Sequence, residues 1–268
     1  MENFWKNYSF LNSLSDSKKI ILFLRKYIMK NSNIIDFKYH LRQYNNTYET
    51  TKQICSFLNK NISLKAKVIL DFGSGAGSNL YFLRKKYKIS KGFGFDNSPE
   101  LVKIANQIMH QKKIKEIKFF VDDIEKRKNV KKKIKSKIDV VTILQVLSVL
   151  EDYKKVLNSA TSLKPKFIAV SSLFWDGYLD FKIKVNFLEK NKKGIKKTAI
   201  YNIYSIYKYL EFMKSKGYKK NYIKKLNIKN LKFKNRKIMG SYTTNLNGKK
   251  TLITGPLIQN WYFILSKK

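Results

Sequence analysis

The sequence predicts an α/β fold in which helices cover both faces of a doubly wound, mostly parallel sheet. Short β-rich segments alternate with stretches whose apolar residues recur at helical spacing, a rhythm typical of parallel sheets. A glycine-rich turn joins the first of these strands to the helix after it. The chain has 268 residues, 43% of them hydrophobic, enough for one large core, which makes a wholly disordered chain untenable.

The expected core elements follow one another between residues 65 and 175. Strands are expected at 67–72, 92–96, 118–122, 138–144 and 167–173. The strongest helix start lies after the second strand, where Ser98 can cap, Pro99 suits the first helical position and Glu100 faces the positive end of the dipole. A helix over 153–162 leads into the fifth strand.

Two flanking regions complete the expected organisation. Residues 1–64 form a helical N-terminal cap, because apolar residues recur at steps of three and four in the stretches 20–28, 34–48 and 50–58. Residues 176–268 form a substrate-side insertion and C-terminal strands. The expected elements there are strands at 181–187, 197–204, 219–228, 238–244, 251–253 and 261–265, a helix over 206–216 ending at Gly217, and a hairpin turn at Asn247-Gly248. No linker or repeat divides the chain, and we expect a single domain over 1–268.

Charge and cysteine content narrow the class of protein. The chain has 57 Lys and Arg against 18 Asp and Glu, a formal charge of +39. A basic face suits nucleic acid, but these lysines are scattered beside Asn and Ile, as an A- and T-rich coding sequence would place them, and charge alone does not name the partner. The single Cys55 excludes an internal disulfide framework. No apolar run is long enough to span a membrane and the start lacks a signal peptide, so we expect a cytoplasmic protein.

The most informative motif is the glycine-rich turn after the first strand. Gly73, Gly75 and Gly77 allow the backbone to approach a ligand where a side chain would collide. Asp71 lies two residues before the first glycine, where a carboxylate suits a cationic group better than a pyrophosphate; the alternative is that it only caps the turn. The fingerprint of dinucleotide-dependent dehydrogenases needs a third glycine where this chain has Ser78, which disfavours that class of enzyme.

Carboxylates follow the next two strands. Asp96 ends the second strand, where it can accept both hydroxyls of a ribose. Asp122 and Asp123 end the third strand, where one of them can accept the exocyclic amine of adenine while the other caps a helix or faces solvent. Because parallel strands end at one rim of a sheet, these loops predict a single nucleoside site.

In these motifs the sequence resembles the class I S-adenosylmethionine-dependent methyltransferases, over about residues 50–175. The resemblance implies a Rossmann-like seven-stranded sheet whose last strand, here 261–265, is antiparallel, with S-adenosyl-L-methionine as cofactor. It places the glycines and Asp71 at the methionine portion, Asp96 at the ribose and Ile124 on the adenine ring. The implied cofactor-binding residues are Asp71, Gly73, Ser74, Gly75, Gly77, Asp96, Asn97, Asp122, Asp123, Ile124 and Gln145. The C-terminal region is similar to that of bacterial members of the family, a likeness that names no substrate.

The residues after the fourth strand bear on the methyl acceptor. Amino methyltransferases acting on adenine or glutamine often carry Asn or Asp, Pro-Pro and an aromatic there, whereas this chain has Leu144-Gln145-Val146-Leu147. Methylation of a cytosine carbon needs a cysteine nucleophile, and Cys55 is expected in the core. No Cys or His cluster indicates a metal site.

We therefore expect methyl transfer to an oxygen or nitrogen of a small metabolite or sugar intermediate, by a monomer or homodimer. Candidates for a general base are His40 and Asp176, and expected substrate-binding residues are Tyr39, His40, Trp175, Tyr201 and Tyr204. His40 has a lid or packing role as its alternative, and the two later tyrosines have a place in the core as theirs. The alternative functions are a tRNA or rRNA methyltransferase, favoured by charge, and a non-catalytic RNA- or partner-binding module on the same scaffold.

Overall fold

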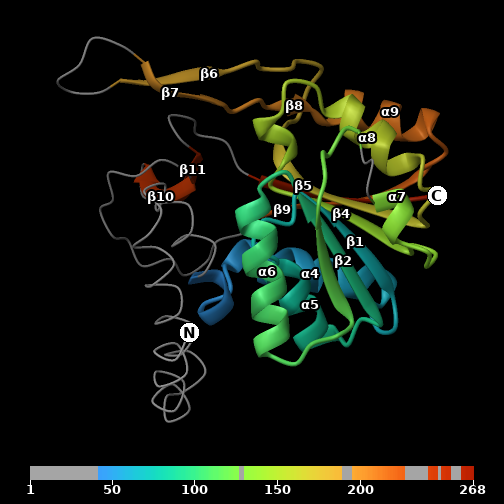
Figure 1. Ribbon diagram of the computed structural model, residues 1–268. Coiled ribbons are helices and arrows are strands. Elements are labelled where there is room, and N and C mark those ends of the chain that lie inside the picture. The colour runs from blue at the N-terminus through green and yellow to red at the C-terminus, as the bar shows by residue number, and fades with distance from the viewer. Residues whose placement is uncertain (1–41, 127–129, 189–194, 227–240, 247–248, 255–260) are drawn as a thin grey trace.

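The computed structural model describes residues 42–126, 130–188, 195–226, 241–246, 249–254 and 261–268 (Figure 1). Within these ranges the main sheet has eight strands. Seven lie in the order β3-β2-β1-β4-β5-β12-β9, and β8 pairs with the end of β5. The strands are β1 (Val68–Phe72), β2 (Lys91–Asp96), β3 (Ile117–Val121), β4 (Val140–Leu144), β5 (Phe167–Trp175), β8 (Tyr204–Ser205), β9 (Lys220–Lys225) and β12 (Trp261–Lys267).

Helices cover both faces of this sheet, as the alternating pattern predicted (Figure 1). One face packs against α4 (Glu49–Ile62), α5 (Ser78–Tyr87) and α6 (Pro99–Gln111). The other packs against α7 (Val130–Lys133), α8 (Tyr153–Thr161) and α9 (Ile206–Ser215). Strands β1 and β4 are buried because both of their faces are covered, which explains their continuous apolar sequences.

Local signals in the sequence set the helix ends. The Ser98 side chain accepts a hydrogen bond from the Leu101 amide at 3.2 Å, and Pro99 occupies the first turn of α6. Asp152 caps α8 by accepting from the Lys154 amide at 2.9 Å. After α9, Gly217 adopts a φ of +88°, the left-handed conformation expected of a glycine beyond a helix end.

The last strand is antiparallel, which confirms the implied Rossmann-like methyltransferase sheet. β12 lies between β5 and β9 and runs antiparallel to both, with Ile264 opposite Val170 and Ile223. Its buried apolar residues contact the cores on both faces of the sheet. Since β9 is parallel to β5, it ends at the same rim of the sheet as β1 to β5, and the chain leaves and re-enters the sheet there.

The segment after β5 differs in detail from the prediction. Strands expected over 181–187 and 197–204 are shorter and form the antiparallel pair β6 (Lys184–Leu188) and β7 (Ile195–Ile200), which extends away from the sheet in Figure 1. Tyr204 and Ser205 instead pair with Phe174 and Trp175 as β8. β10 (Ser241–Leu246) and β11 (Lys249–Thr254) form a second antiparallel pair; the expected turn at 247–248 between them lies outside the described residues.

Only the end of the N-terminal cap falls within the described residues. Residues 42–45 are helical, and the helix expected over 34–48 ends there, before α4 begins at Glu49. The earlier helical stretches lie outside the described part. Among the described helices, none has the length and apolar composition needed to cross a membrane.

Candidate functional site

The glycine-rich turn and the predicted carboxylates meet at the carboxyl ends of the parallel strands. β1, β2, β3, β4 and β5 run in one direction, so their final residues share one rim of the sheet. The loop 73–77 joins β1 to α5 at this rim. In open α/β sheets this is the edge where ligands bind.

Asp96 holds the glycine turn in place. Its Oδ2 accepts a hydrogen bond from the Gly75 amide at 2.9 Å, and its Oδ1 accepts one from the Ser98 amide at 3.0 Å. The Ser74 amide donates to the Phe95 carbonyl at 3.0 Å. The end of β2 therefore fixes both the turn and the start of α6, and Gly75 and Asp96 lie together as the sequence predicted for one site.

The three glycines of the turn share a left-handed backbone conformation, and two of them also lie too close to a neighbouring side chain to carry a Cβ. Gly73, Gly75 and Gly77 have φ values of +68°, +52° and +88°, a region that side chains disfavour. A Cβ on Gly73 would lie 2.7 Å from the Val146 side chain, whereas one on Gly77 would overlap the Phe119 ring. Gly77 thus permits close packing of the turn on β3, a reason that the sequence motif did not reveal.

Gly77→Ala is expected to lower the free energy of unfolding by about 2–3 kcal/mol, because it combines left-handed backbone strain with steric overlap. Gly217→Ala is the matched control. Its φ is also +88°, but the nearest atom to the added Cβ is 3.9 Å away, so we expect a loss of about 1 kcal/mol from the backbone alone. Denaturant titration measures both, and equal losses would contradict the role given to Phe119.

Asp71 is a buried carboxyl beneath the turn. It is 1% exposed, and its Oδ1 accepts a hydrogen bond from the Thr142 hydroxyl at 2.6 Å. No partner for its Oδ2 is present among the described residues. Burial raises the pKa of Asp71 to about 7, the Thr142 hydrogen bond opposes the rise, and the neighbouring Asp96 charge adds to it. An unpartnered carboxyl oxygen beside a ligand loop suits a cationic group.

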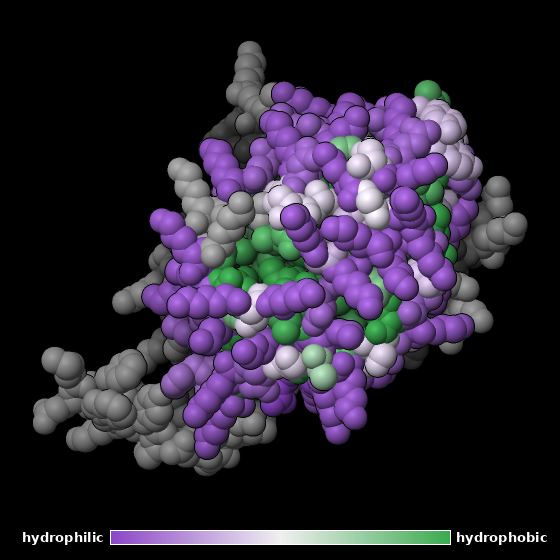
Figure 2. All heavy atoms as spheres, turned by 90° about the vertical axis from the view of Figure 1, so that its right-hand side faces the viewer, coloured by the Kyte–Doolittle hydropathy of each residue, from purple (hydrophilic) through white to green (hydrophobic). Residues whose placement is uncertain are grey.

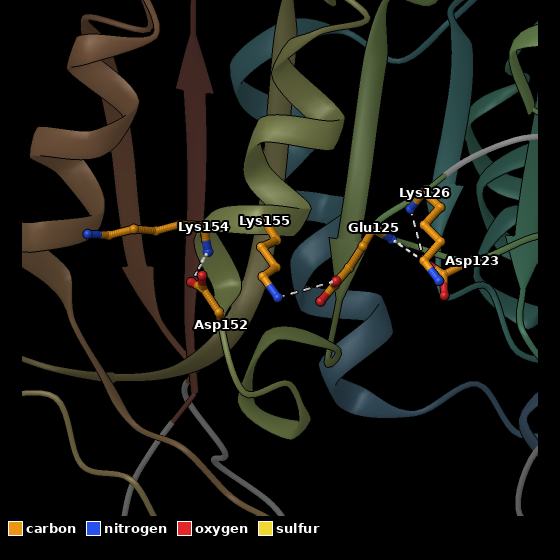
Figure 3. Close-up of polar contacts among 6 residues, drawn as sticks. All are labelled: Asp123, Glu125, Lys126, Asp152, Lys154 and Lys155. Atoms are coloured by element: carbon orange, nitrogen blue, oxygen red, sulfur yellow. Dashed lines mark hydrogen bonds and ion pairs between the residues drawn. The ribbon is translucent and has the colours of Figure 1, made fainter.

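The two acidic residues after β3 have distinct environments. Asp122 is buried, and its oxygens accept from the Asp123 and Val130 amides at 2.9 and 2.8 Å, which fixes the backbone around α7. Figure 3 shows the exposed Asp123, whose Oδ1 accepts from the Glu125 and Lys126 amides at 2.8 and 2.9 Å. These backbone hydrogen bonds lower the pKa of Asp123 and keep it charged. Ile124 is half-buried against the core beside α7 and α8.

Three other predicted cofactor residues lie at the same rim. Ser74 is buried, and its hydroxyl has no partner among the described residues. Gln145 follows β4 with a φ of +62°, and its backbone amide donates to the Ser171 carbonyl at 2.8 Å. Asn97 follows Asp96 and is exposed. Gly73, Gly75, Asp71 and the unpartnered Ser74 hydroxyl together fit a cofactor with a polar, cationic end.

The segment before α4 contacts the glycine turn through Gln43 and Tyr44, two residues for which the sequence predicted no such role. The Tyr44 hydroxyl donates a hydrogen bond to the Ala76 carbonyl, and its ring lies 5.3 Å from that of Tyr81. The Ser78 hydroxyl and the Gln43 side-chain oxygen are 2.7 Å apart. Tyr44 was visible only as an apolar position of a helical pattern, and nothing in the sequence linked it to a residue 32 positions later.

Tyr44→Phe is expected to weaken cofactor binding about threefold to tenfold, because the Ala76 carbonyl loses a hydrogen bond worth about 1 kcal/mol while the ring remains. Calorimetric titration of S-adenosylmethionine measures the change. Tyr222→Phe on β9 removes a hydroxyl from the far edge of the sheet and should leave the affinity unchanged. Equal affinities for parent and Tyr44→Phe would show that this contact does not position the turn.

The expected substrate residues divide between surface and core. Trp175 is 42% exposed at the end of β5, and Asp176 beside it accepts from the Tyr207 hydroxyl at 3.3 Å. Tyr201 is half-buried next to β7. Tyr204 is fully buried, and its hydroxyl donates to the Leu150 carbonyl at 2.7 Å. We correct its assignment: Tyr204 packs in the core and offers no surface to a substrate.

Two predicted residues, Tyr39 and His40, lie outside the described residues. Cys55 is fully buried in α4, where burial raises the pKa of its thiol. Within the described ranges no three His, Cys, Asp or Glu side chains gather as metal ligands would.

The fold and the rim together define a Rossmann-like methyltransferase of class I. The chain belongs to the methyltransferase domain family, whose model matches residues 63–219. It is accordingly an enzyme of this class, with S-adenosylmethionine as its cofactor. No curated protein sequence matches it.

Solved structures share the fold at low identity. An S-adenosylmethionine-dependent methyltransferase from Clostridium acetobutylicum is 13% identical with a TM-score of 0.53, covering 88% of this chain and 99% of its own. Magnesium protoporphyrin IX methyltransferase from Synechocystis, with S-adenosylmethionine bound, is 15% identical with a TM-score of 0.51, over 96% and 99%. A structure from a complex between the Haloferax volcanii Trm112 methyltransferase activator and a methyltransferase is 16% identical with a TM-score of 0.51, covering 84% of this chain and 91% of its own. At these identities the likeness shows the fold alone.

Proposed function

We propose that this enzyme transfers a methyl group from S-adenosylmethionine to an oxygen or nitrogen of a small metabolite or sugar intermediate. The observation that carries the site is the 2.9 Å hydrogen bond between Gly75 and Asp96, which joins the glycine turn to a carboxylate at the rim. A small acceptor is favoured because β4 ends at Leu144 and is followed by Gln145-Val146-Leu147 rather than by the motif of amino methyltransferases that act on adenine or glutamine.

The described residues suggest a role for each part of the cofactor site. Asp96 would hold the ribose, and the turn would receive the methionine portion, with Asp71 below it. Asp123 is preferred to Asp122 for the adenine amine, because Asp122 is buried whereas Asp123 is exposed and leaves Oδ2 outside its backbone hydrogen bonds. Ile124 would pack on the ring, and Gln145, Ser74 and Asn97 would line the remaining rim.

The cofactor supplies an activated methyl group, and this chain's residues bind, align and exclude water. The acceptor would enter beside Trp175 and Tyr201, at the end of β5 and the base of the β6–β7 pair. Asp176 is the described candidate for a general base, since its carboxylate is exposed at this entrance.

A screen of small metabolites with methyl-labelled S-adenosylmethionine tests this function. We expect label transfer to one class of hydroxyl- or amine-bearing acceptor, together with saturable cofactor binding by calorimetry. Failure to bind the cofactor at millimolar concentration would contradict the proposal and favour a non-catalytic binding module.

The charge of the chain supports a tRNA or rRNA methyltransferase as the second candidate. Figure 2 shows that hydrophilic residues cover most of the face bearing α8 and α9, with apolar residues visible in recesses between them. RNA binding through lysines would weaken steeply with salt, because counterions are released from the phosphates. A steep salt slope with preference for one RNA, and label transfer to it, would replace the small acceptor.

A further inference from the structure

Exposed aromatic side chains gather at the end of β5. We define the aromatic patch as Trp175, Tyr178, Phe181 and Tyr207, which are 42%, 60%, 38% and 40% exposed. The rings of Tyr178 and Tyr207 are stacked with centroids 5.1 Å apart, and Trp175 meets Phe181 edge-on at 5.8 Å. Figure 1 shows β5, β8 and α9, the elements that carry or adjoin the patch, side by side.

Two carboxylates border this patch, each bonded to a tyrosine of the other segment. Asp176, in the loop, accepts from the Tyr207 hydroxyl of α9 at 3.3 Å, and Glu211, in α9, accepts from the Tyr178 hydroxyl of the loop at 3.1 Å. The reciprocal bonds fix the loop on the helix. Within the described part of the chain neither carboxylate lies in an ion pair, although the charge of Asp176 acts on Lys225 at the end of β9.

This arrangement is unexpected in so basic a chain. With 57 Lys and Arg against 18 Asp and Glu, a carboxylate has many potential partners. Elsewhere lysines lie over half-buried rings, as Lys220 does over Tyr222 at 5.4 Å and Lys112 over Tyr81 at 5.1 Å. Among the described residues no lysine lies over any of the four rings of the patch.

We propose that the aromatic patch binds a positively charged nitrogen of the methyl acceptor, held against the ring faces and beside the carboxylates of Asp176 and Glu211. Aromatic faces attract cations through their quadrupole, and an ammonium gains further from adjacent negative charge. A polyol lacks the charge, and an anionic acceptor would be repelled by both carboxylates. The acceptor is therefore an amine- or ammonium-bearing small molecule.

The patch lies beyond the cofactor rim, at the outer end of β5. β5 is separated from β1 by β4 alone, a lateral spacing of about 10 Å. The end of β1 is level with Val170, and Trp175 lies five residues, about 16 Å, further along β5. An acceptor held at the patch by its charged nitrogen must therefore extend across the rim toward the glycine turn. The inference that the bound cation is the methyl acceptor rests on the proposed methyl transfer. The binding of a cation to the patch can be measured independently of that function.

Choline and its uncharged isostere 3,3-dimethylbutan-1-ol are the probes, titrated by ligand-observed NMR at constant ionic strength with S-adenosylmethionine present and absent. We expect the parent to bind choline at least about tenfold more tightly than the isostere, the scale of a cation on partly desolvated rings. Asp176→Asn and Glu211→Gln keep the shape and the acceptor oxygens, and each should reduce this preference severalfold; together they should abolish it.

Two further variants keep the result interpretable. Tyr178→Leu removes the most exposed ring of the patch without touching the core and should also abolish the preference. Glu116→Gln removes a carboxylate that pairs with Arg84 just before β3, at the edge of the sheet away from the cofactor rim. This variant should leave the preference for choline intact. Equal binding of both probes to the parent, or a preference that survives the double variant, would overturn the inference.

The outcomes separate this inference from the proposed function. Cofactor binding without a preference for choline refutes the patch alone. A preference for choline that depends on Asp176 and Glu211, in a protein that does not bind S-adenosylmethionine, supports the patch as a cation site and contradicts the proposed methyl transfer.

Discussion

Asp71→Asn is expected to make the cofactor-free protein more stable at pH 8 than the parent. The pKa of Asp71 is raised by burial from 3.8 to about 7, so the folded state holds a proton that the unfolded state releases. The contribution of Asp71 to the parent's stability is therefore greatest below about pH 4 and is lost as the pH rises through about 7, by at most about 4 kcal/mol for three pKa units. Asparagine does not titrate and avoids this loss.

Chemical denaturation of both proteins at pH 5 and pH 8 measures the effect. The advantage of the asparagine variant should grow between the two pH values, while its side-chain oxygen can still accept from the Thr142 hydroxyl. Thr142→Val is the companion variant: it removes the hydrogen bond that opposes the rise, so it should raise the pKa of Asp71 further. Parallel pH profiles for parent and Asp71→Asn would show that Asp71 is ionised in the folded protein throughout this range.

The same substitution is expected to weaken S-adenosylmethionine binding on the order of 100-fold at pH 8, the scale for removing a charged partner from a buried site. In the parent, a cationic cofactor favours the ionised carboxyl, so affinity should rise with pH up to about 7 and then level off. Calorimetry across pH 5.5–8.5 tests this. An asparagine variant that keeps the parent's affinity would exclude Asp71 from the cofactor site.

The sheet was predictable because its signals are local and periodic. Each of the first five strands is a short apolar run between turn residues, and Ser98 and Pro99 announce α6 before any tertiary contact is known. The antiparallel last strand followed from the family resemblance. The region after β5 was less predictable. The alternating residues near Tyr204 could have continued the strand that pairs with β6 or added a strand to the main sheet, and their pairing with Phe174 of β5 decides for the main sheet.

The site was predictable as a set of residue types but not as a network. Gly75 and Asp96 were expected at one rim, and the structure joins them. The partner of Asp71 is Thr142, 71 positions away, and Tyr44 reaches the turn from before α4. Such contacts depend on which strands become neighbours. Tyr204 was placed at the substrate because an aromatic residue in a strand gives no sign of which side is covered.

Asp96→Ala is expected to reduce cofactor affinity by about 1–3 kcal/mol, which is roughly 5- to 160-fold, the range for losing a charged hydrogen-bond partner. Two causes contribute, since the Asp96 carboxylate holds the Gly75 and Ser98 amides and is the proposed ribose ligand. Hydrogen exchange of the Gly75 amide reports the first cause: its protection should fall in the variant even without cofactor.

The ribose contact is isolated by pairing the variant with an altered ligand. S-adenosylhomocysteine and its 2′,3′-dideoxy counterpart differ only in the two hydroxyls that are proposed to donate hydrogen bonds to Asp96. The parent should bind the dideoxy ligand much more weakly, whereas Asp96→Ala should bind the two alike, because the interaction has already been lost. If removing the hydroxyls weakens binding to the variant by the same factor as to the parent, Asp96 supports the turn and another group holds the ribose.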